Sequence, residues 1–311
     1  METSMMHCAI CRNGSESCII TMYISGINIY KKIIIRPFLS QNMMSGAQSA
    51  GNQRPTHIAR VSSLVGTSET TRATPFTSQF CQWLAGLIDG DGSLKVSKAG
   101  HTSCEITIGF ADLVCLRYLQ DKLGGTIKPR SGEKALRWRL HNKQGMINTI
   151  NSINGHIRHS ARQVQLHRVC QVLHIAPLRP APSMDTYNAW FAGNFDAEGT
   201  VTLNNTNNQP QLTISVTNKH YSDVQPYMDT FGGDIYFNSS QNGYYKWTVQ
   251  SRVDVLAMLG YFKQCSPHSF KKQRLILMNS FYQLYDLRAF IPESIHHSAW
   301  QQFVNKWNAK I

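Results

Sequence analysis

From about residue 80 onward, the hydrophobic positions follow helical and strand-like periods in turn. An apolar stretch with helical spacing ends near Asp91, and alternating polar and apolar residues then predict two strands. A further helix is predicted to stop at Gly124, because glycine commonly ends helices. The predicted bounds are strands at 94–98, 104–110, 126–129 and 135–141, and helices at 113–123, 144–153 and 162–173.

The same pattern occurs twice. Residues 82–92, QWLAGLIDGDG, return as residues 189–199, AWFAGNFDAEG. The glycine pair at 124–125 returns at 232–233, and Trp138 corresponds to Trp247. All these landmarks recur after 107 to 109 positions, so the chain contains two copies of one unit of about a hundred residues.

The order of predicted elements indicates an α/β fold of the α+β kind, built from two αββαββα units related by a pseudo-twofold axis. Arg137 and Arg139 alternate with apolar neighbours, as do Ser93 and Lys95. Successive strand residues point to opposite faces, so each antiparallel sheet should have one face covered by helices and one open, polar and basic face.

The composition predicts the limits of the units. Residues 1–76 lack a sustained apolar period and are expected to form a poorly ordered N-terminal extension or leader. The two units are expected at 77–176 and 187–295, joined by a proline-containing linker at 177–186. Residues 296–311 are expected to form a C-terminal tail or helix.

The chain has 31 Lys and Arg against 18 Asp and Glu, a formal net charge of +13 that favours a polyanionic partner. The longest apolar stretch, residues 18–30, is interrupted and too short to span a bilayer, so we expect no membrane anchoring. Eight cysteines without paired spacing favour a reducing compartment. Three histidines at 156, 159 and 167 lack metal-ligand spacing and are expected on a solvated or phosphate-facing surface.

Small residues recur four positions apart within the repeated motif: Gly86 and Gly90 in the first copy, Gly193 and Ala197 in the second. Glycine is costly inside a helix, so its recurrence predicts close packing of the two motif helices against each other.

A carboxylate stands at the predicted end of each motif helix, Asp91 or Glu198, followed by a glycine expected to stop the helix. The C-terminal end of a helix carries partial negative charge, and packing would bring the two acids together. Such a pair needs a proton or a cation, and Mg²⁺ is the simplest choice, with Mn²⁺ or Ca²⁺ able to take its place. Asp89 and Asp196 are expected to be structural hydrogen-bonding groups first and metal ligands second.

With LAGLIDGDG at 84–92 and FAGNFDAEG at 191–199 in register, residues from about 80 to about 290 resemble the single-chain LAGLIDADG homing endonucleases. The resemblance implies a monomer whose sheets lie along the major groove of double-stranded DNA. It also implies cleavage of both strands with short 3′ overhangs, at metals held by the motif acids. Carboxylate-held metals suit phosphodiester hydrolysis independently of this resemblance.

The family also uses a basic residue at the start of the last helix of each unit, and a polar residue after the second strand that positions water. In the second copy these correspond to Lys272, with Lys271 as the near alternative, and to Asn218. The first copy offers Arg162 and Phe110, so its site is expected to be slower or inactive. The catalytic residues so implied are Asp91, Glu198, Lys272, Arg162 and Asn218, and the metal positions are Asp91, Glu198, Gly90 and Ala197.

Arg and Lys suit guanine, and Asn and Gln suit adenine, in the major groove. The expected DNA-binding residues on the open faces are Lys95, Lys128, Arg130, Arg137 and Arg139 in the first unit, and Asn204, Asn205, Gln211, Tyr236 and Lys246 in the second.

Two other functions are compatible with the sequence. The same fold assists RNA splicing in some introns, so a maturase that binds group I intron RNA is the alternative, and an inactive DNA-binding relic is a third. Both motif acids are present, which favours cleavage. An organellar intron origin is implied by the family, with the mitochondrion ahead of the chloroplast.

Overall fold

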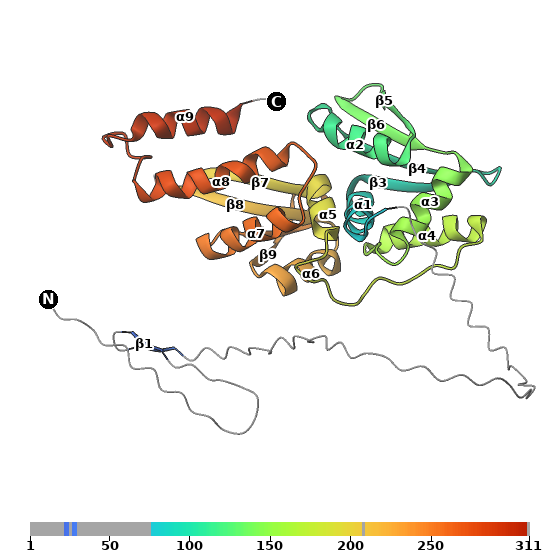
Figure 1. Cartoon of the computed structure of the whole chain (residues 1–311), viewed down its shortest axis with the longest axis horizontal. Coiled ribbons are helices and arrows are strands. Elements are labelled where there is room, and N and C mark those ends of the chain that lie inside the picture. Colours follow the sequence, from blue (N-terminus) through green and yellow to red (C-terminus); the bar gives the residue numbers. More distant parts are fainter. Residues whose placement is uncertain (1–21, 25–26, 30–75, 207–208, 310–311) are drawn as a thin grey trace, which may run out of the picture. The chain divides into compact units, whose positions relative to one another are not determined.

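The computed structural model describes residues 22–24, 27–29, 76–206 and 209–309 (Figure 1). The chain divides into two units, Met1–Thr67 and Ser68–Ile311. In the first, β1 (Met22–Ile24) pairs antiparallel with β2 (Ile27–Ile29). Most of the predicted extension at 1–76 lies outside the described residues, and the predicted boundaries of the repeat units stay predictions.

The second unit contains both copies of the repeat. The first copy consists of α1 (Ser78–Asp91), β3 (Gly92–Val96), β4 (Thr102–Gly109), α2 (Leu113–Leu123), β5 (Thr126–Pro129), β6 (Ala135–Leu140), α3 (Lys143–Ile153) and α4 (Ser160–Leu173). The second copy consists of α5 (Trp190–Glu198), β7 (Gly199–Thr206), β8 (Gln209–Asn218), α6 (Tyr221–Phe231), β9 (Asp234–Asn238), β10 (Tyr244–Val249), α7 (Arg252–Gln264) and α8 (Lys271–Asp286). Helix α9 (His297–Asn308) then packs on α8.

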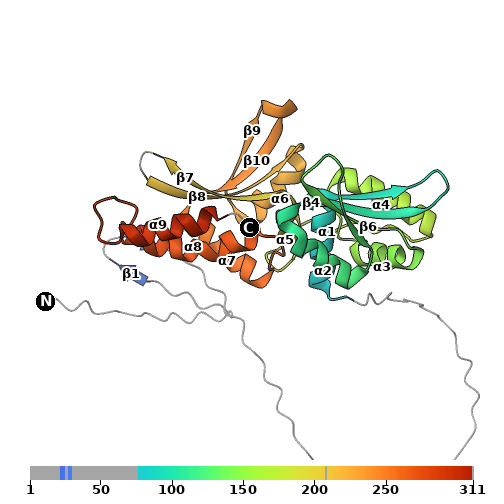
Figure 2. The same cartoon turned by 90° about the horizontal axis from the view of Figure 1, so that it is seen from above.

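Each copy builds an antiparallel four-stranded sheet with the same strand order, β3-β4-β6-β5 and β7-β8-β10-β9. The α+β prediction with two αββαββα units is therefore confirmed. In the second copy, α7 and α8 lie on one side of the sheet and leave the other side open (Figure 2). Apolar strand residues such as Trp138 and Trp247 are fully buried beneath the helices.

The recurring tryptophan and glycine pair form the same contact in both copies. Trp138 Nε1 donates to the carbonyl oxygen of Gly124 at 2.9 Å, and Trp247 Nε1 donates to that of Gly232 at 2.8 Å. Both glycines have positive φ, +75° and +73°, a region that glycine enters without steric cost. The contact joins the C-terminal end of α2 to β6 in the first copy, and that of α6 to β10 in the second.

Helices α1 and α5 pack with their backbones in direct contact. A Cβ built on Gly86 would overlap the carbonyl oxygen of Trp190, and one built on Gly193 would overlap that of Trp83. The predicted helix interface is thus present and reciprocal between the copies.

The glycines that follow the motif helices do not adopt the left-handed conformation in which glycine often ends a helix. Gly92 and Gly199 have extended backbone, with φ of −85° and −71°. A Cβ at these positions would overlap Ile88 and the ring of Phe195, respectively. Glycine is needed there because the strand turns tightly over the preceding helical turn. Among the described residues, no helix is both long and apolar enough to cross a membrane.

Substitution of Gly86 by alanine should destabilise the protein by roughly 3 kcal/mol, because the new methyl group can be accommodated only by separating α1 from α5. Urea denaturation followed by circular dichroism measures the change. Gly260, which lies in α7 with open space around it, is the matched control. Gly260→Ala should raise stability by about 0.5–1 kcal/mol through helix propensity. Equal effects of the two substitutions would contradict the proposed role of the contact.

Candidate active site at the paired helix ends

Asp91 and Glu198 are the last residues of α1 and α5, and the ends of these helices touch. A Cβ on Gly90 would overlap that of Ala197 and would lie 3.2 Å from Cγ of Glu198. The two carboxylates therefore belong to one cluster, where the partial negative charges of both helix ends also converge.

The environment of this cluster opposes ionisation. Burial, together with the charge of Glu198, raises the pKa of Asp91 to about 7, although the charge of Lys271 acts in the opposite direction. Burial also raises the pKa of Glu198. Near neutral pH the two acids therefore favour a bound proton or cation.

Two basic side chains reach the same helix ends. Nζ of Lys271 donates to the carbonyl oxygens of the three residues that precede Glu198, at 3.0, 2.7 and 2.9 Å. Arg162 donates from Nε and Nη2 to the carbonyl oxygens of Ile88 and Gly90, at 3.0 and 3.1 Å. Cations at a helix C-terminus neutralise its dipole, so each basic residue offsets one helix end.

The lysine at this position is Lys271 and not Lys272, which was the residue expected from the sequence. Helix α8 begins at Lys271, one residue earlier than predicted. Successive helical side chains point about 100° apart, so Lys272 is directed instead to a groove between α7 and α8, beside Phe262 and Leu275. Lys271 corresponds to Arg162 at the repeat spacing of 109 residues that also relates the sheet tryptophans.

Asp89 joins the last helix of its own copy to the motif helix of the other copy. It accepts hydrogen bonds from the backbone N–H groups of Arg158 and His159, at 2.7 and 3.3 Å, and from Nε1 of Trp190, at 2.8 Å. The predicted structural role of this aspartate is confirmed. His159 is 5% exposed and lies between Asp89 and Tyr227, so the solvated position predicted for it was wrong. It borders the second of the clefts described below, and a phosphate-facing position stays a prediction.

Asp196 repeats this arrangement in the second copy. It accepts from the backbone N–H groups of His268 and Ser269, at 2.8 and 2.9 Å, and from Nε1 of Trp83, at 2.8 Å. The two aspartates therefore fix where α4 and α8 begin, and hence where Arg162 and Lys271 stand.

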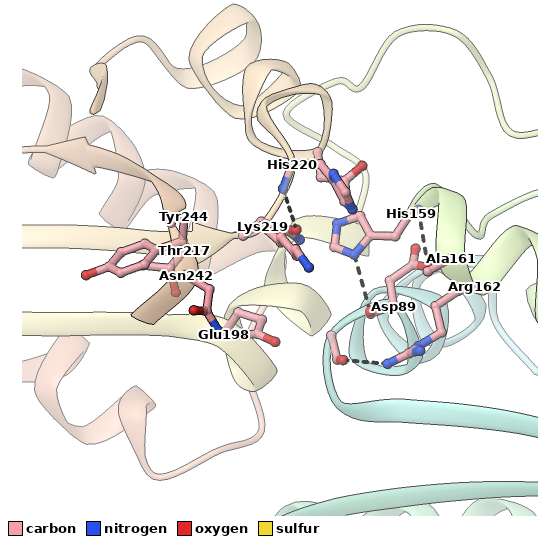
Figure 3. A pocket seen from close by; sticks show the side chains of 14 residues that line it. Asp89, His159, Ala161, Arg162, Glu198, Thr217, Lys219, His220, Asn242 and Tyr244 are labelled. Atoms are coloured by element: carbon pink, nitrogen blue, oxygen red, sulfur yellow. Dashed lines mark hydrogen bonds between the residues drawn. The ribbon is translucent and has the colours of Figure 1, made fainter. Parts of the chain in front are cut away.

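Two clefts of about 630 Å³ each border the helix ends. The first contains Asp91 and is lined by the first sheet; the second contains Glu198 and is lined by the second sheet. Arg162 borders both. Figure 3 shows the second cleft, with Lys219 and His220 opposite Arg162.

Asn218 lies in the second cleft, but its counterpart is not the expected Phe110. Val216 and Ile106 are the residues paired with the glycine after each motif, and Asn218 and Ile108 follow two positions later. Ile108 borders the first cleft, whereas Phe110 starts a 3₁₀ turn and is 51% exposed. The first cleft thus has an apolar residue where the second has an amide.

Several polar residues around the site were not predicted from the sequence, among them Lys219, His220 and Asp112. Lys219 and His220 border the second cleft directly after Asn218, a polar run that could have drawn attention to them. Asp112 accepts a hydrogen bond from the backbone N–H of Phe270 at 2.8 Å, next to Lys271. No local signal marks Asp112, because its partner is 158 residues away.

The predicted DNA-binding residues mostly share the open faces of the two sheets. Strand pairing puts Lys95, Lys128, Arg137 and Arg139 on one face of the first sheet. Arg130 follows β5 and borders the same cleft. The corresponding residues of the second sheet are Asn204, Gln211, Tyr236 and Lys246.

Asn205 is the exception. It pairs with Pro210 and follows Leu203, which pairs with the buried Leu212, so it belongs to the helix-covered face of the sheet. Its prediction as an open-face residue was wrong, because side-chain direction alternates along β7.

The oxygen atoms at the helix ends fit a hydrated divalent cation. Among the described residues, no three His, Cys, Asp or Glu side chains gather into a metal cluster. Mg²⁺ usually binds through one or two carboxylates and completes its shell with water and substrate phosphates, which suits Asp91 and Glu198. The carbonyl oxygens of Gly90 and Ala197 already accept from Arg162 and Lys271, and each retains a second lone pair.

The raised pKa of Asp91 predicts how stability varies with pH. Because the folded state holds this proton more tightly than the unfolded chain does, the carboxyl contributes stability below about pH 4 that is lost as pH rises through 7. Asp91→Asn should therefore stabilise the metal-free protein at pH 8 by roughly 1–3 kcal/mol and by less at pH 5.5. Thermal unfolding at both pH values measures this. Asp121→Asn, at an exposed site in α2, is the matched control.

Several known proteins resemble this chain in sequence or in fold. The family model described as LAGLIDADG endonuclease matches residues 84–173. The chain is 43% identical over 266 residues to a probable intron-encoded endonuclease aI2 of Debaryomyces hansenii, covering 80% of this chain and 40% of that protein. It is 48% identical over 235 residues to the intron-encoded RNA maturase bI4 of Saccharomyces cerevisiae, covering 74% and 37%. The chain thus spans about two-fifths of the length of these two relatives.

The match to the intron-encoded DNA endonuclease ai2b of Dictyostelium discoideum covers most of that relative. The two sequences are 30% identical over 237 residues, which cover 73% of this chain and 89% of that protein. In fold, the chain resembles the I-LtrWI LAGLIDADG homing endonuclease bound to target DNA, with a TM-score of 0.56, 16% identity, and coverage of 75% of this chain and 99% of that one. The repeated motif, the paired sheets and these relatives together show that the chain belongs to the LAGLIDADG endonuclease family.

Proposed function

We propose that this chain is a site-specific double-strand DNA endonuclease encoded within an intron. Its target lies in the major groove against the two open sheet faces, and cleavage of both strands leaves short 3′ overhangs. The observation that carries the proposal is the pairing of Asp91 and Glu198 at touching helix ends, one acid from each copy.

Asp91 and Glu198 would hold divalent metal, preferably Mg²⁺, with the carbonyl oxygens of Gly90 and Ala197 beside them. When bound, the metal neutralises charge on the scissile phosphates and makes an attacking water more acidic. Two acids serve two strands, which accounts for the need for two copies of the motif.

The basic residues act on the charge of the site. Lys271 directs Nζ at three backbone carbonyls, and an ammonium group has three N–H donors. Lys271 therefore acts on a phosphate through its charge, while its hydrogen bonds hold the end of α5 in position. Arg162 is the corresponding cation of the first copy and keeps further N–H donors for a phosphate oxygen.

The two clefts differ in the side chains that can hydrogen-bond to a water molecule. Asn218 orients water in the second cleft, and Lys219 adds a positive charge there. Ile108 cannot donate or accept a hydrogen bond in the first cleft. The two strands are therefore cut at unequal rates, and a nicked duplex accumulates before the double-strand break.

Base recognition is assigned to the open faces. The first sheet presents Lys95, Lys128, Arg137 and Arg139 to guanine edges and phosphates, with Arg130 beside them. The second sheet presents mainly uncharged polar groups, Asn204, Gln211 and Tyr236, with Lys246.

Asp91→Asn and Glu198→Gln should each reduce double-strand cleavage at least roughly a thousandfold, because each removes a negatively charged metal ligand. The assay incubates the purified full chain and Mg²⁺ with a library of intron-insertion-like DNA duplexes. Binding to the same DNA in Ca²⁺ serves as the control for folding. Cleavage that survives both substitutions would contradict the site assignment.

Lys271→Met should slow cleavage by roughly a hundredfold, since it removes a buried positive charge beside both acids. Lys272→Met is the matched control and should leave the rate within about threefold, as expected for a residue outside the reacting cleft. Strand-specific end labels record which strand is affected. A larger effect at Lys272 would restore the assignment made from the sequence alone.

A second function is favoured by the similarity to the yeast RNA maturase, which is 48% identical to this chain over 235 residues. Binding of group I intron RNA would use positive surface, without the metal acids. In a splicing assay, Asp91→Asn and Glu198→Gln would keep full activity if this chain is a maturase. Splicing by the wild type without any DNA cleavage would replace the endonuclease proposal.

The relatives named above are fungal and slime-mould proteins whose names describe them as intron-encoded. We infer a mitochondrial location from this, with the chloroplast as the alternative. Fractionation of cells expressing a tagged chain distinguishes the two.

A further inference from the structure

One acidic residue occupies the centre of the basic open face of the first sheet. Glu105 lies in the middle of β4 and pairs with Ser93 of β3 and Arg139 of β6. It is 8% exposed. A negative charge on a surface that binds a polyanion weakens that binding, so its presence requires an explanation.

Glu105 bridges two of the predicted base-reading residues. Its Oε2 accepts a hydrogen bond from Nζ of Lys95 at 2.6 Å, and its Oε1 lies 3.2 Å from Nε of Arg139. The side chains of Lys95 and Arg139 are 55% and 49% exposed, whereas that of Glu105 is 10% exposed. The carboxylate therefore lies beneath two cations that project from the sheet.

The carboxylate is ionised at neutral pH. Burial acts to raise the pKa of Glu105, but the hydrogen bond from Lys95 and the charges of Lys95, Arg139 and Arg137 bring it below its ordinary value. Ser215 takes the corresponding place in the second sheet, where it pairs with Thr200 and Thr248. If the fold itself required an acid at this position, both sheets would have one. The negative charge of Glu105 therefore serves a function specific to the first sheet.

Glu105 itself is poorly placed to read a base. Both of its oxygen atoms are engaged, and little of its side chain reaches solvent. Arg139, in contrast, uses Nε toward Glu105 and keeps the two parallel N–H donors at the outer end of its guanidinium. A pair of this kind matches O6 and N7 of guanine.

We propose that Glu105 is a specificity-determining positioning residue that fixes Lys95 and Arg139, so that their free N–H donors read guanine-containing base pairs in the half-site contacted by the first sheet. The inference rests on the proposed DNA-endonuclease function. Positioning before binding lowers the entropy lost when these long side chains are ordered, and it limits the bases they can satisfy.

The test measures base preference, which a merely structural role would not change selectively. A randomised duplex library is enriched for cleavage by the wild type, and the selected target is then altered one base pair at a time. Glu105→Gln and Glu105→Ser, the latter copying Ser215, should lose preference at least about threefold at the base pairs where Arg139→Ala or Lys95→Ala also loses it. Affinity for the intact target should change less than the preference does, because removal of the negative charge offsets the loss of positioning.

Glu133→Gln is the matched control. Glu133 borders the same cleft and pairs with Arg130 at 3.3 Å, but both side chains are about half exposed and solvent screens the pair. This variant removes the same charge and should keep the wild-type preference profile. Thermal unfolding of every variant separates lost preference from lost folding.

The double variant Glu105→Gln with Arg139→Ala should have the profile of Arg139→Ala at shared positions, since residues that act as one unit are not additive. The inference is overturned if a selective wild type and Glu105→Gln share one profile, if Glu133→Gln broadens the profile equally, or if the double variant is additive. A wild type without base preference would instead overturn the proposed function, and the inference with it.

Discussion

The backbone contact between α1 and α5 is the constraint on which the site depends. No side chain separates these helices where Gly86 faces Trp190 and Gly193 faces Trp83. Helices that approach this closely also bring their C-terminal ends together, so Asp91 and Glu198 share one location. A separation by a single methyl group would move the acids apart and open the site to water, which would remove the burial that raises their pKa values.

Two sets of hydrogen bonds place the charges around this contact: those accepted by Asp89 and Asp196, and those donated by Arg162 and Lys271. The motif aspartates bind the backbone N–H groups just before α4 and α8, so these helices begin where Arg162 and Lys271 can reach the carbonyls of α1 and α5. Positive charge is thus held at the helix ends beside the negative charge of the two acids. The copies differ within this framework only in the cation, Arg162 or Lys271, and differ further in the residues that line the clefts and the sheet faces.

Elements with strong local end signals could be predicted closely: α2 and β5 have the bounds expected from a glycine pair and a proline, and the repeat identified the fold class. The acids and the motif aspartates were found because they recur at one spacing. The sequence pointed to Lys272 instead of Lys271, an error of one residue. The start of α8 is set by distant groups, Asp196 and Asp112, which no local pattern reveals. Glu105 could not be found from composition, since its meaning depends on cross-strand neighbours.

The exchange of tryptophan N–H groups between the copies makes each copy a structural requirement of the other. A copy taken alone would keep a buried aspartate without one of its donors and a glycine strip without cover. The chain is in this sense an obligate dimer joined by a linker. Halves exchanged between related proteins should therefore fold together only when their motif helices match. The strand residues on the open faces of the sheets are free to diverge. The packing of the two copies and the residues of the open sheet faces can thus evolve separately.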